Sequence, residues 1–242
     1  GGGIGGLTLA LSLHQIGVRC RVFESVKEIK PLGVGINVLP HACRELIELG
    51  LQDDLERTSV RTSELAYFSK HGKQIWSEQR GLEAGYKWPQ YSIHRGELQF
   101  ILLNAALARI GRENVLTGHH VSHWDETENG VRVHFADRDG RPAGSEEGSL
   151  LIASDGIHSA VRGRLFPGEG PPQWSRRILW RGVTIAKPFM TGSSMIMAGY
   201  PQGKFLAYPI SRPDPNGHQM INWIGEREFE ETYEWRREDY NR

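Results

Sequence analysis

The stretch GGGIGGLTLALSLHQIGVRCRVFES, residues 1–25, joins a glycine-rich turn to an apolar helix and a short strand. Gly1, Gly3 and Gly6 fit the spacing G-x-G-x-x-G, and the apolar residues that follow recur with helical spacing as far as Gly17. In such a β-α-β unit the glycines permit a tight turn, close approach of a pyrophosphate to the backbone, and close packing of helix on strand. The free N–H groups at the helix start then face the phosphates. The stretch therefore predicts a dinucleotide site.

Glu24 ends the strand predicted over residues 19–24. A carboxylate at this place accepts both hydroxyls of an adenosine ribose and repels a 2′-phosphate, which favours FAD or NAD over NADP. The alternative is a glycine-rich turn of an ordinary α/β protein, but the glycines, the helix and Glu24 in register favour the nucleotide. A strand should also precede Gly1, so we expect the chain to be part of a longer protein.

The composition excludes several classes of partner. The chain has 242 residues, with 29 basic and 29 acidic residues, so it offers no electrostatic footprint for nucleic acid or an anionic membrane. No apolar run approaches the about 20 residues that cross a bilayer. Cys20 and Cys43 lack C-x-x-C spacing, which favours reduced packing residues and a cytoplasmic protein.

The rest of the chain alternates between two patterns. We expect helices over 40–49, 95–111 and 157–166, a β-hairpin over 63–78, strands at 91–94, 115–125, 131–136 and 149–154, turns at 127–130 and 137–144, and only strands from 176 onward. We therefore predict a nucleotide-binding α/β domain formed by residues 1–62 and 90–175. A mostly antiparallel substrate domain would comprise residues 63–89 and 176–242, with a solvated charge run over 226–242.

Two charged residues follow predicted strands. Asp155 lies at the end of the apolar stretch LLIASDG, where it either hydrogen-bonds a ribose or pyrophosphate or caps the next helix. Arg95 begins a helix, where a cation opposes the helix dipole. Either an anionic ligand or an ion pair with Glu97 or Glu83 accounts for it.

Five stretches, in chain order, carry a family resemblance: GGGIGGLTLALSLHQIGVRCRVFES, PLGVGIN, YSIHRGEL, ASDGIHSAVR and WRGVT. Together they resemble the class A flavoprotein aromatic hydroxylases over nearly the whole chain. The resemblance implies an α/β, p-hydroxybenzoate hydroxylase-like fold, in which a Rossmann-type FAD-binding domain is interleaved with a mostly antiparallel β-sheet substrate domain. It implies an FAD-dependent monooxygenase that uses NADH or NADPH and O2 to hydroxylate an aromatic acid or a phenazine-like compound through a flavin hydroperoxide. It is also compatible with a homodimer.

In that family the AMP half of FAD is held by residues that match Gly1, Gly3, Gly6 and Glu24. The backbone near Val121 would approach the adenine. These roles are implied by the resemblance and extend the dinucleotide site predicted from the opening stretch.

The resemblance also implies residues around the rest of the cofactor. Arg95 would lie along the ribityl-pyrophosphate, and Asp155 with Gly156 would match a D-G motif that serves the pyrophosphate and the use of NAD(P)H. The segment 33–37, with Gly35 and Asn37, would pass beside the isoalloxazine ring. The family's later G-D-A-x-H-x-x-x-P stretch does not occur, so we expect the chain to lack its far end as well.

The stretch GKFLAYPIS, residues 203–211, belongs to the sheet that the resemblance places over the flavin. Side chains alternate along a strand, so Leu206 and Tyr208 share one face while Phe205, Ala207 and Pro209 share the other. We predict that Leu206 and Tyr208 contact the substrate, because a phenol among apolar neighbours orients a hydroxylated ring. The aromatic residues of these strands are also compatible with sheet core.

Other functions remain as alternatives. An NAD-dependent dehydrogenase would account for Glu24 but not for Arg95, Asp155 and the second sheet. A non-catalytic flavin-binding module would account for the missing later motif. For metals, His119 and His123 could converge on one strand face, but no cysteine or close carboxylate completes a site, so we expect none.

Overall fold

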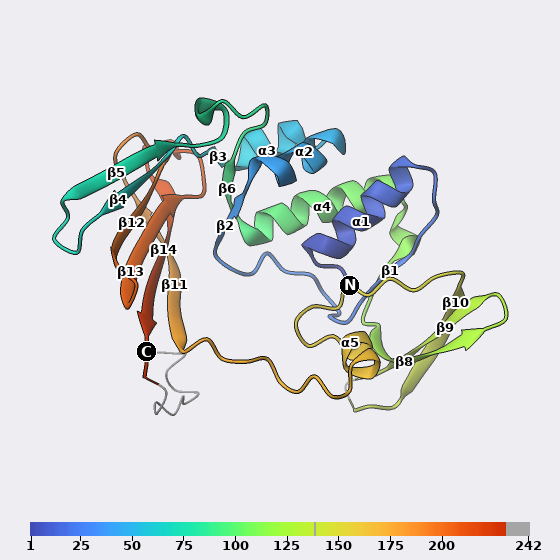
Figure 1. Ribbon diagram of the computed structural model, residues 1–242. Coiled ribbons are helices and arrows are strands. Elements are labelled where there is room, and N and C mark those ends of the chain that lie inside the picture. The colour runs from blue at the N-terminus through green and yellow to red at the C-terminus, as the bar shows by residue number, and fades with distance from the viewer. Residues whose placement is uncertain (138, 231–242) are drawn as a thin grey trace. The chain divides into compact units, whose positions relative to one another are not determined.

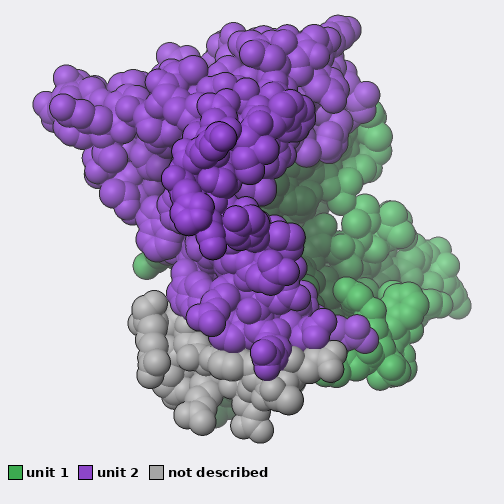
Figure 2. All heavy atoms as spheres, turned by 60° about the vertical axis from the view of Figure 1, so that its left-hand side comes forward, with its two compact units in different colours: residues 1–31, 98–172 green, residues 32–97, 173–242 purple. Residues whose placement is uncertain are grey.

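The computed structural model describes residues 1–137 and 139–230 (Figure 1). The chain divides into two compact units, each built from two separate segments (Figure 2). Unit 1 comprises residues 1–31 and 98–172, and unit 2 comprises residues 32–97 and 173–242. The part of the predicted charge run from residue 231 onward lies outside the described residues.

Unit 1 combines helices with two small sheets. Its elements are α1 (Ile4–Gln15), β1 (Val22–Glu24), all but the first residues of α4 (Arg95–Arg109), the 3-10 helix η2 (Arg112–Asn114), β7 (Val115–Thr117), β8 (His120–Thr127), β9 (Gly130–Ala136), β10 (Pro142–Gly148) and α5 (Ala160–Leu165). Strand β1 pairs in parallel with β7, while β8, β9 and β10 form an antiparallel sheet in the order β10-β9-β8 (Figure 1).

The two long helices of unit 1 follow their apolar periodicity. Leu7 and Leu11 lie one turn apart on α1, and Leu98 and Leu102 lie one turn apart on α4; all four side chains are buried. Helix α1 ends before Gly17, which adopts a φ of 78° that favours glycine. In the described part of the chain, no helix has both the length and the apolar character needed to cross a membrane.

Unit 2 is dominated by a six-stranded sheet. Its elements are β2 (Gly35–Val38), α2 (Pro40–Glu48), α3 (Gln52–Thr58), β3 (Val60–Arg61), β4 (Glu64–Phe68), β5 (Gln74–Gln79), η1 (Gly81–Ala84), β6 (Tyr91–His94), β11 (Arg177–Ala186), β12 (Ser194–Tyr200), β13 (Gly203–Pro209) and β14 (Gln219–Glu228). The large sheet has the order β11-β14-β13-β12-β4-β5, and a smaller one has the order β2-β6-β3. Among the described strand pairs of unit 2, β12–β4 is parallel and the others are antiparallel.

Several predicted elements of unit 2 are confirmed. The hairpin around His71 and Gly72 is β4 and β5, with Gly72 at a φ of 78°. Pro40 occupies the first turn of α2, where its fixed φ suits a helix and its missing N–H costs nothing. Helix α3 was not predicted, because seven residues are too few to establish a helical period.

The expectations for residues 137–154 are wrong in two places. The predicted turn at 137–144 ends earlier, and β10 already begins at Pro142, which pairs with Ala136. Strand β10 is mostly exposed, so it lacks the apolar alternation that marks a half-buried strand. The predicted buried strand at 149–154 is not a strand, and Leu150 is 74% exposed. No described strand pairs with this segment, so its apolar residues do not mark a sheet.

The predicted strand at 115–125 is two strands in different sheets. Strand β7 pairs with β1, whereas β8 pairs with β9. Gly118, between them, has a φ of 75°. The left-handed backbone conformation of Gly118 interrupts the extended conformation, and the chain changes direction there.

Candidate functional site

The glycine-rich turn of unit 1 is tightly packed around Gly1 and Gly6. A methyl group added to Gly6 would overlap the carbonyl oxygen of Gly1, and one added to Gly1 would overlap that of Ser154. Backbone atoms of the turn, of α1 and of the segment before Asp155 therefore lie close together. Only glycine fits at these two positions.

The start of α1 leaves donors free for a ligand. The N-cap residue is Gly3, so no side chain caps the helix, and the first turn carries no acidic residue. A Cβ atom added to Gly3 would meet nothing within 4 Å. Uncapped N–H groups at the positive end of a twelve-residue helix suit a phosphate group.

Glu24 lies beside this turn. Its Oε2 accepts the N–H of Gly2 at 2.6 Å, and its Oε1 accepts the N–H of Val26 at 3.0 Å. Partial burial raises the pKa of Glu24, but the hydrogen bonds from Val26, Gly2 and Ser25 outweigh burial and hold the pKa below its ordinary value. The carboxylate is therefore ionised at neutral pH. Its Oε1 also accepts the Ser25 hydroxyl at 3.0 Å, whereas Oε2 keeps a lone pair for a further donor.

Gln99 is a part of this turn that sequence reasoning missed. Its Nε2 donates to the carbonyl oxygen of Gly2 at 2.8 Å. Gln99 lies one helical turn after Arg95 in α4. Side chains at positions i and i+4 share a helix face, so this spacing within YSIHRGELQ could have indicated that Gln99 lies near the same site as Arg95.

Asp155 and Gly156 form an exposed turn before α5. The Oδ2 atom of Asp155 accepts the N–H of Val161 at 3.3 Å, and Ser159, the N-cap, accepts the N–H of Arg162 at 2.9 Å. Burial raises the pKa of Asp155, but hydrogen bonds from Ser159 and from backbone N–H groups outweigh it and lower the pKa. Asp155 thus accepts an N–H group from the first turn of α5, although Ser159 is the N-cap, and a role toward FAD stays a prediction.

Val121 is half-buried on β8 and packs against the buried cluster Val131, Val133 and Phe135. Its side chain therefore belongs to the core of the β8-β10 sheet. The predicted contact of its backbone with adenine stays a prediction.

In unit 2, the backbone of Gly35 is held by hydrogen bonds with Asn222 and Arg181, two side chains from strands far along the chain; we call these two contacts the clamp on Gly35. Its N–H donates to Oδ1 of Asn222 at 2.7 Å, and its carbonyl accepts a hydrogen bond from Arg181 at 2.9 Å. A Cβ atom at Gly35 would lie 2.7 Å from Cβ of Asn222 and 2.8 Å from Cγ2 of Ile210. Sequence reasoning missed Asn222 and Arg181, although Arg181 lies within the quoted stretch WRGVT.

The same arginine connects Gly35 with Tyr208. Tyr208 is 2% exposed, and burial raises its pKa, against the opposing charge and hydrogen bond of Arg181. Leu206 is half-buried, while Phe205 on the opposite face is 43% exposed. The structure thus brings together one residue predicted near the flavin and one predicted at the substrate.

Asn37 directs its side chain into a polar network of unit 2. Ser92 donates its hydroxyl hydrogen to Oδ1 of Asn37 at 2.6 Å, so the Thr62 hydroxyl, 2.6 Å from Ser92, must donate to Ser92. The Nδ2 group of Asn37 donates to Sδ of Met195 at 3.8 Å. Asn37 can therefore approach a cofactor most readily through its backbone.

Arg95 lies exposed at the start of α4, against the backbone of Gly33. Its own N–H donates to the carbonyl of Val34 at 2.9 Å. Within the described residues its guanidinium makes no ion pair, and neither Glu97 nor Glu83 is its partner. A cation without a protein partner remains available to an anionic ligand.

These features fit the AMP half of FAD. The uncapped start of α1 would face the pyrophosphate, Gly3 leaves open space beside it, and the ionised Glu24 would accept ribose hydroxyls.

Relatives with known names match most of the chain. Phenazine 1,6-dicarboxylic acid hydroxylase PhzS of Lysobacter antibioticus is 46% identical over 228 residues, which are 93% of this chain and 56% of that protein. An FAD-dependent urate hydroxylase of Klebsiella pneumoniae is 32% identical over 197 residues, which are 76% of this chain and 46% of that protein. The chain thus spans about half the length of the curated relatives that it matches.

Solved structures match the fold. HpxO of Klebsiella pneumoniae, complexed with FAD and uric acid, superposes with a TM-score of 0.77 at 26% identity, over 98% of this chain and 57% of that chain. The 2,6-dihydroxypyridine-3-hydroxylase of Arthrobacter nicotinovorans has a TM-score of 0.70 at 25% identity, over 96% of this chain and 56% of that chain. The predicted fold class, α/β and p-hydroxybenzoate hydroxylase-like, is confirmed.

The family of this chain is identified by a family model that matches most of its sequence. The model of the family described as FAD binding domain matches residues 1–220, from the glycine-rich turn into the last described strand, β14. The chain therefore belongs to the FAD-binding domain family.

Proposed function

We propose that the protein containing this chain is an FAD-dependent monooxygenase that uses NADH or NADPH and O2 to hydroxylate an aromatic acid or a phenazine-like compound. The observation that carries the proposal is the 46% identity to a phenazine 1,6-dicarboxylic acid hydroxylase over nearly the whole chain. The urate hydroxylase and the dihydroxypyridine hydroxylase also act on aromatic rings, which supports the same reaction class.

Bound FAD supplies the oxidation of NAD(P)H and the transfer of one oxygen atom to the substrate. The protein therefore has to bind FAD and the aromatic substrate and orient them toward each other. In unit 1, the N–H groups of α1 bind the pyrophosphate and Glu24 accepts the ribose hydroxyls. The backbone near Val121 contacts the adenine. Asp155 orders the turn at Gly156 through its contact with α5.

In unit 2, the clamp on Gly35 fixes the segment that runs beside the isoalloxazine ring, and Arg95 provides a positive charge for the ribityl-pyrophosphate. Leu206 and Tyr208 form the substrate wall, and Arg181 couples Tyr208 to Gly35. This assignment corresponds to a functional division into an FAD-binding domain of residues 1–62 and 90–175 and a substrate domain of residues 63–89 and 176–242.

Glu24→Ala is expected to weaken FAD binding about 10- to 100-fold, the loss that corresponds to charged hydrogen bonds of about 1.5–3 kcal/mol. Fluorescence titration of the apoprotein with FAD measures the dissociation constant. Glu28→Ala is the matched control, because Glu28 pairs at the surface with Lys30. Equal affinities of the Glu24 and Glu28 variants would exclude Glu24 as the ribose ligand.

Arg95→Ala is expected to lower FAD affinity by at least about 10-fold without changing the melting temperature, because the exposed Arg95 guanidinium makes no ion pair among the described residues. Arg112→Ala, at another exposed arginine, is the control. Loss of soluble Arg95 variant, or an unchanged FAD dissociation constant, would contradict the assignment.

The function is tested on the longer protein that contains this chain. A purified protein with a flavin absorbance spectrum separates a flavoenzyme from an NAD-dependent dehydrogenase. Aromatic acids and phenazines are then screened for coupled NAD(P)H oxidation, O2 uptake and a product heavier by one oxygen atom. Bound FAD with no coupled product for any substrate would favour a non-catalytic flavin-binding module.

We place the protein in the cytoplasm, either alone or as a homodimer, and without nucleic-acid or membrane partners. Cys20 and Cys43 are both free thiols, which suits a reducing compartment. Size-exclusion chromatography with light scattering measures the assembly.

A further inference from the structure

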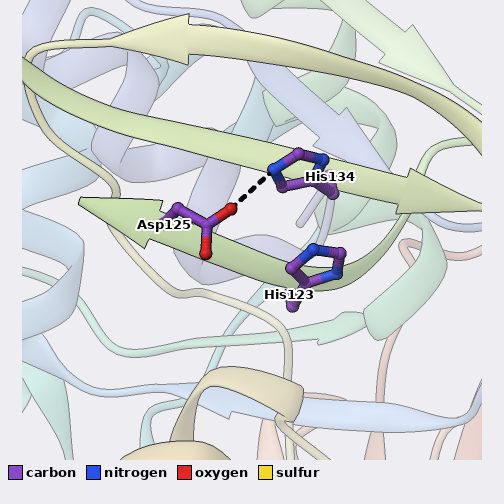
Figure 3. Close-up of side chains that lie close together, drawn as sticks. All are labelled: His123, Asp125 and His134. Carbon is purple, nitrogen blue, oxygen red and sulfur yellow. Dashed lines mark hydrogen bonds and ion pairs between the residues drawn. The ribbon is translucent and has the colours of Figure 1, made fainter. Parts of the chain in front are cut away.

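Three potential metal ligands lie on one face of the β8-β9 ladder in unit 1. His123 and Asp125 are two residues apart on β8, and His134 is directly opposite His123 on β9. One ligand atom from each residue lies within 4.8 Å of the others. Figure 3 shows the carboxylate of Asp125 directed toward the two imidazole rings, which stack with their centroids 4.2 Å apart.

A β-bulge creates this arrangement and corrects the expectation that His119 and His123 converge. The register shifts between Val121 and His123, so one extra residue changes the face on which His123 projects. His119 instead packs against Phe23 and Phe135. The actual partners of His123 are a carboxylate and a second imidazole, which sequence alternation did not reveal.

A neighbouring hydrogen bond prepares His123 as a ligand. The Ser122 hydroxyl donates to the carbonyl of His134 at 3.1 Å, so its oxygen must accept the hydrogen bond from Nδ1 of His123 at 3.0 Å. Nδ1 of His123 therefore carries the proton and Nε2 keeps its lone pair. Metal-bound histidines are commonly oriented by such a bond at the other ring nitrogen.

The surrounding charge is compatible with a cation. Asp125 lies 2.9 Å from Nε2 of His134, and its side chain is 57% exposed. Arg132 is opposite Asp125 in the ladder, but its Nε donates to Glu147 on β10 at 2.8 Å. The charge of Arg132 is thus neutralised by Glu147, so Arg132 does not compete with the histidines for the carboxylate of Asp125.

We propose that His123, Asp125 and His134 bind one divalent transition-metal ion of the zinc type, with water completing the coordination. Two imidazoles and one carboxylate suit Zn²⁺, whereas Mg²⁺ and Ca²⁺ require mainly oxygen ligands. Ligands of tetrahedral zinc are about 3.4 Å apart, as follows from bond lengths of about 2.0–2.1 Å. Because His123 and Asp125 are exposed, rotation of their side chains can close the remaining distance.

The test is calorimetric titration of the tag-free full chain with ZnCl2 at neutral pH. One zinc ion per chain is expected to bind, and His134→Ala and Asp125→Asn are each expected to weaken binding at least about 10-fold. His71→Ala, at an exposed histidine in the β4-β5 turn of unit 2, is the matched control and should bind as the unaltered chain does.

No zinc binding by the unaltered chain would overturn the proposal. So would binding that survives both substitutions, since zinc would then lie elsewhere. Far-UV circular dichroism checks folding, and the exposed Asp125→Asn variant carries the test if His134→Ala does not fold. A titration with MgCl2 should show no binding, and binding of Mg²⁺ with similar affinity would contradict the assigned ligand chemistry.

Discussion

Gly6→Ala is expected to destabilise the chain by about 3 kcal/mol and to abolish FAD retention. The added methyl group would overlap the carbonyl oxygen of Gly1, a backbone atom that cannot rotate away. Either α1 or the turn must move, and overpacking of a tight contact costs about 1–3 kcal/mol. The displaced turn also misplaces the N–H groups that would face the pyrophosphate. Urea unfolding and the ratio of flavin to protein absorbance measure the two effects.

Two neighbouring glycines serve as matched variants. Gly5→Ala should keep or slightly increase stability, because a Cβ atom there meets nothing within 4 Å and alanine favours helix. Gly3→Ala should also keep stability but lower FAD retention, because its methyl group enters the open space beside the helix start. If Gly6→Ala unfolds at the same urea concentration as Gly5→Ala, the close packing of the turn is refuted.

Gly35→Ala is expected to destabilise unit 2 by up to about 3 kcal/mol. Its Cβ atom would lie 2.7 Å from Asn222 and 2.8 Å from Ile210, and both of these side chains are fully buried. Relieving the overlap would also stretch the hydrogen bond from Gly35 to Asn222, and an unpaired buried N–H group is itself costly. Denaturant unfolding measures the loss of stability, and the absorbance spectrum of bound FAD reports any movement beside the ring.

The matched control is Gly225→Ala on β14. A Cβ atom at Gly225 meets nothing within 4 Å, and its backbone lies in the same sheet as Asn222. This variant should be as stable as the unaltered chain. An equal effect of the two substitutions would mean that any alanine in this sheet is harmful, and the clamp on Gly35 would lose its support.

Local signals accounted for the elements that the sequence predicted well. Pro40 at the first turn of α2 and the Gly72 turn of the β4-β5 hairpin are properties of a few adjacent residues. The same local reasoning failed at β10, whose residues Pro142–Gly148 are exposed and lack alternation. It failed again at residues 149–154, because an apolar run does not specify whether a pairing strand lies beside it.

The sequence by itself determined the glycine-rich turn, the helix that follows it and the carboxylate of Glu24, because these residues lie close together in residues 1–25 and their spacing is visible in the sequence. The tertiary structure alone decided which residues clamp Gly35, since Asn222 and Arg181 reach it from strands far along the chain. It also decided that His123 faces His134 rather than His119, through one bulge in β8. Strand register and long-range pairing depend on the whole packed unit, and no local pattern of residue types encodes them.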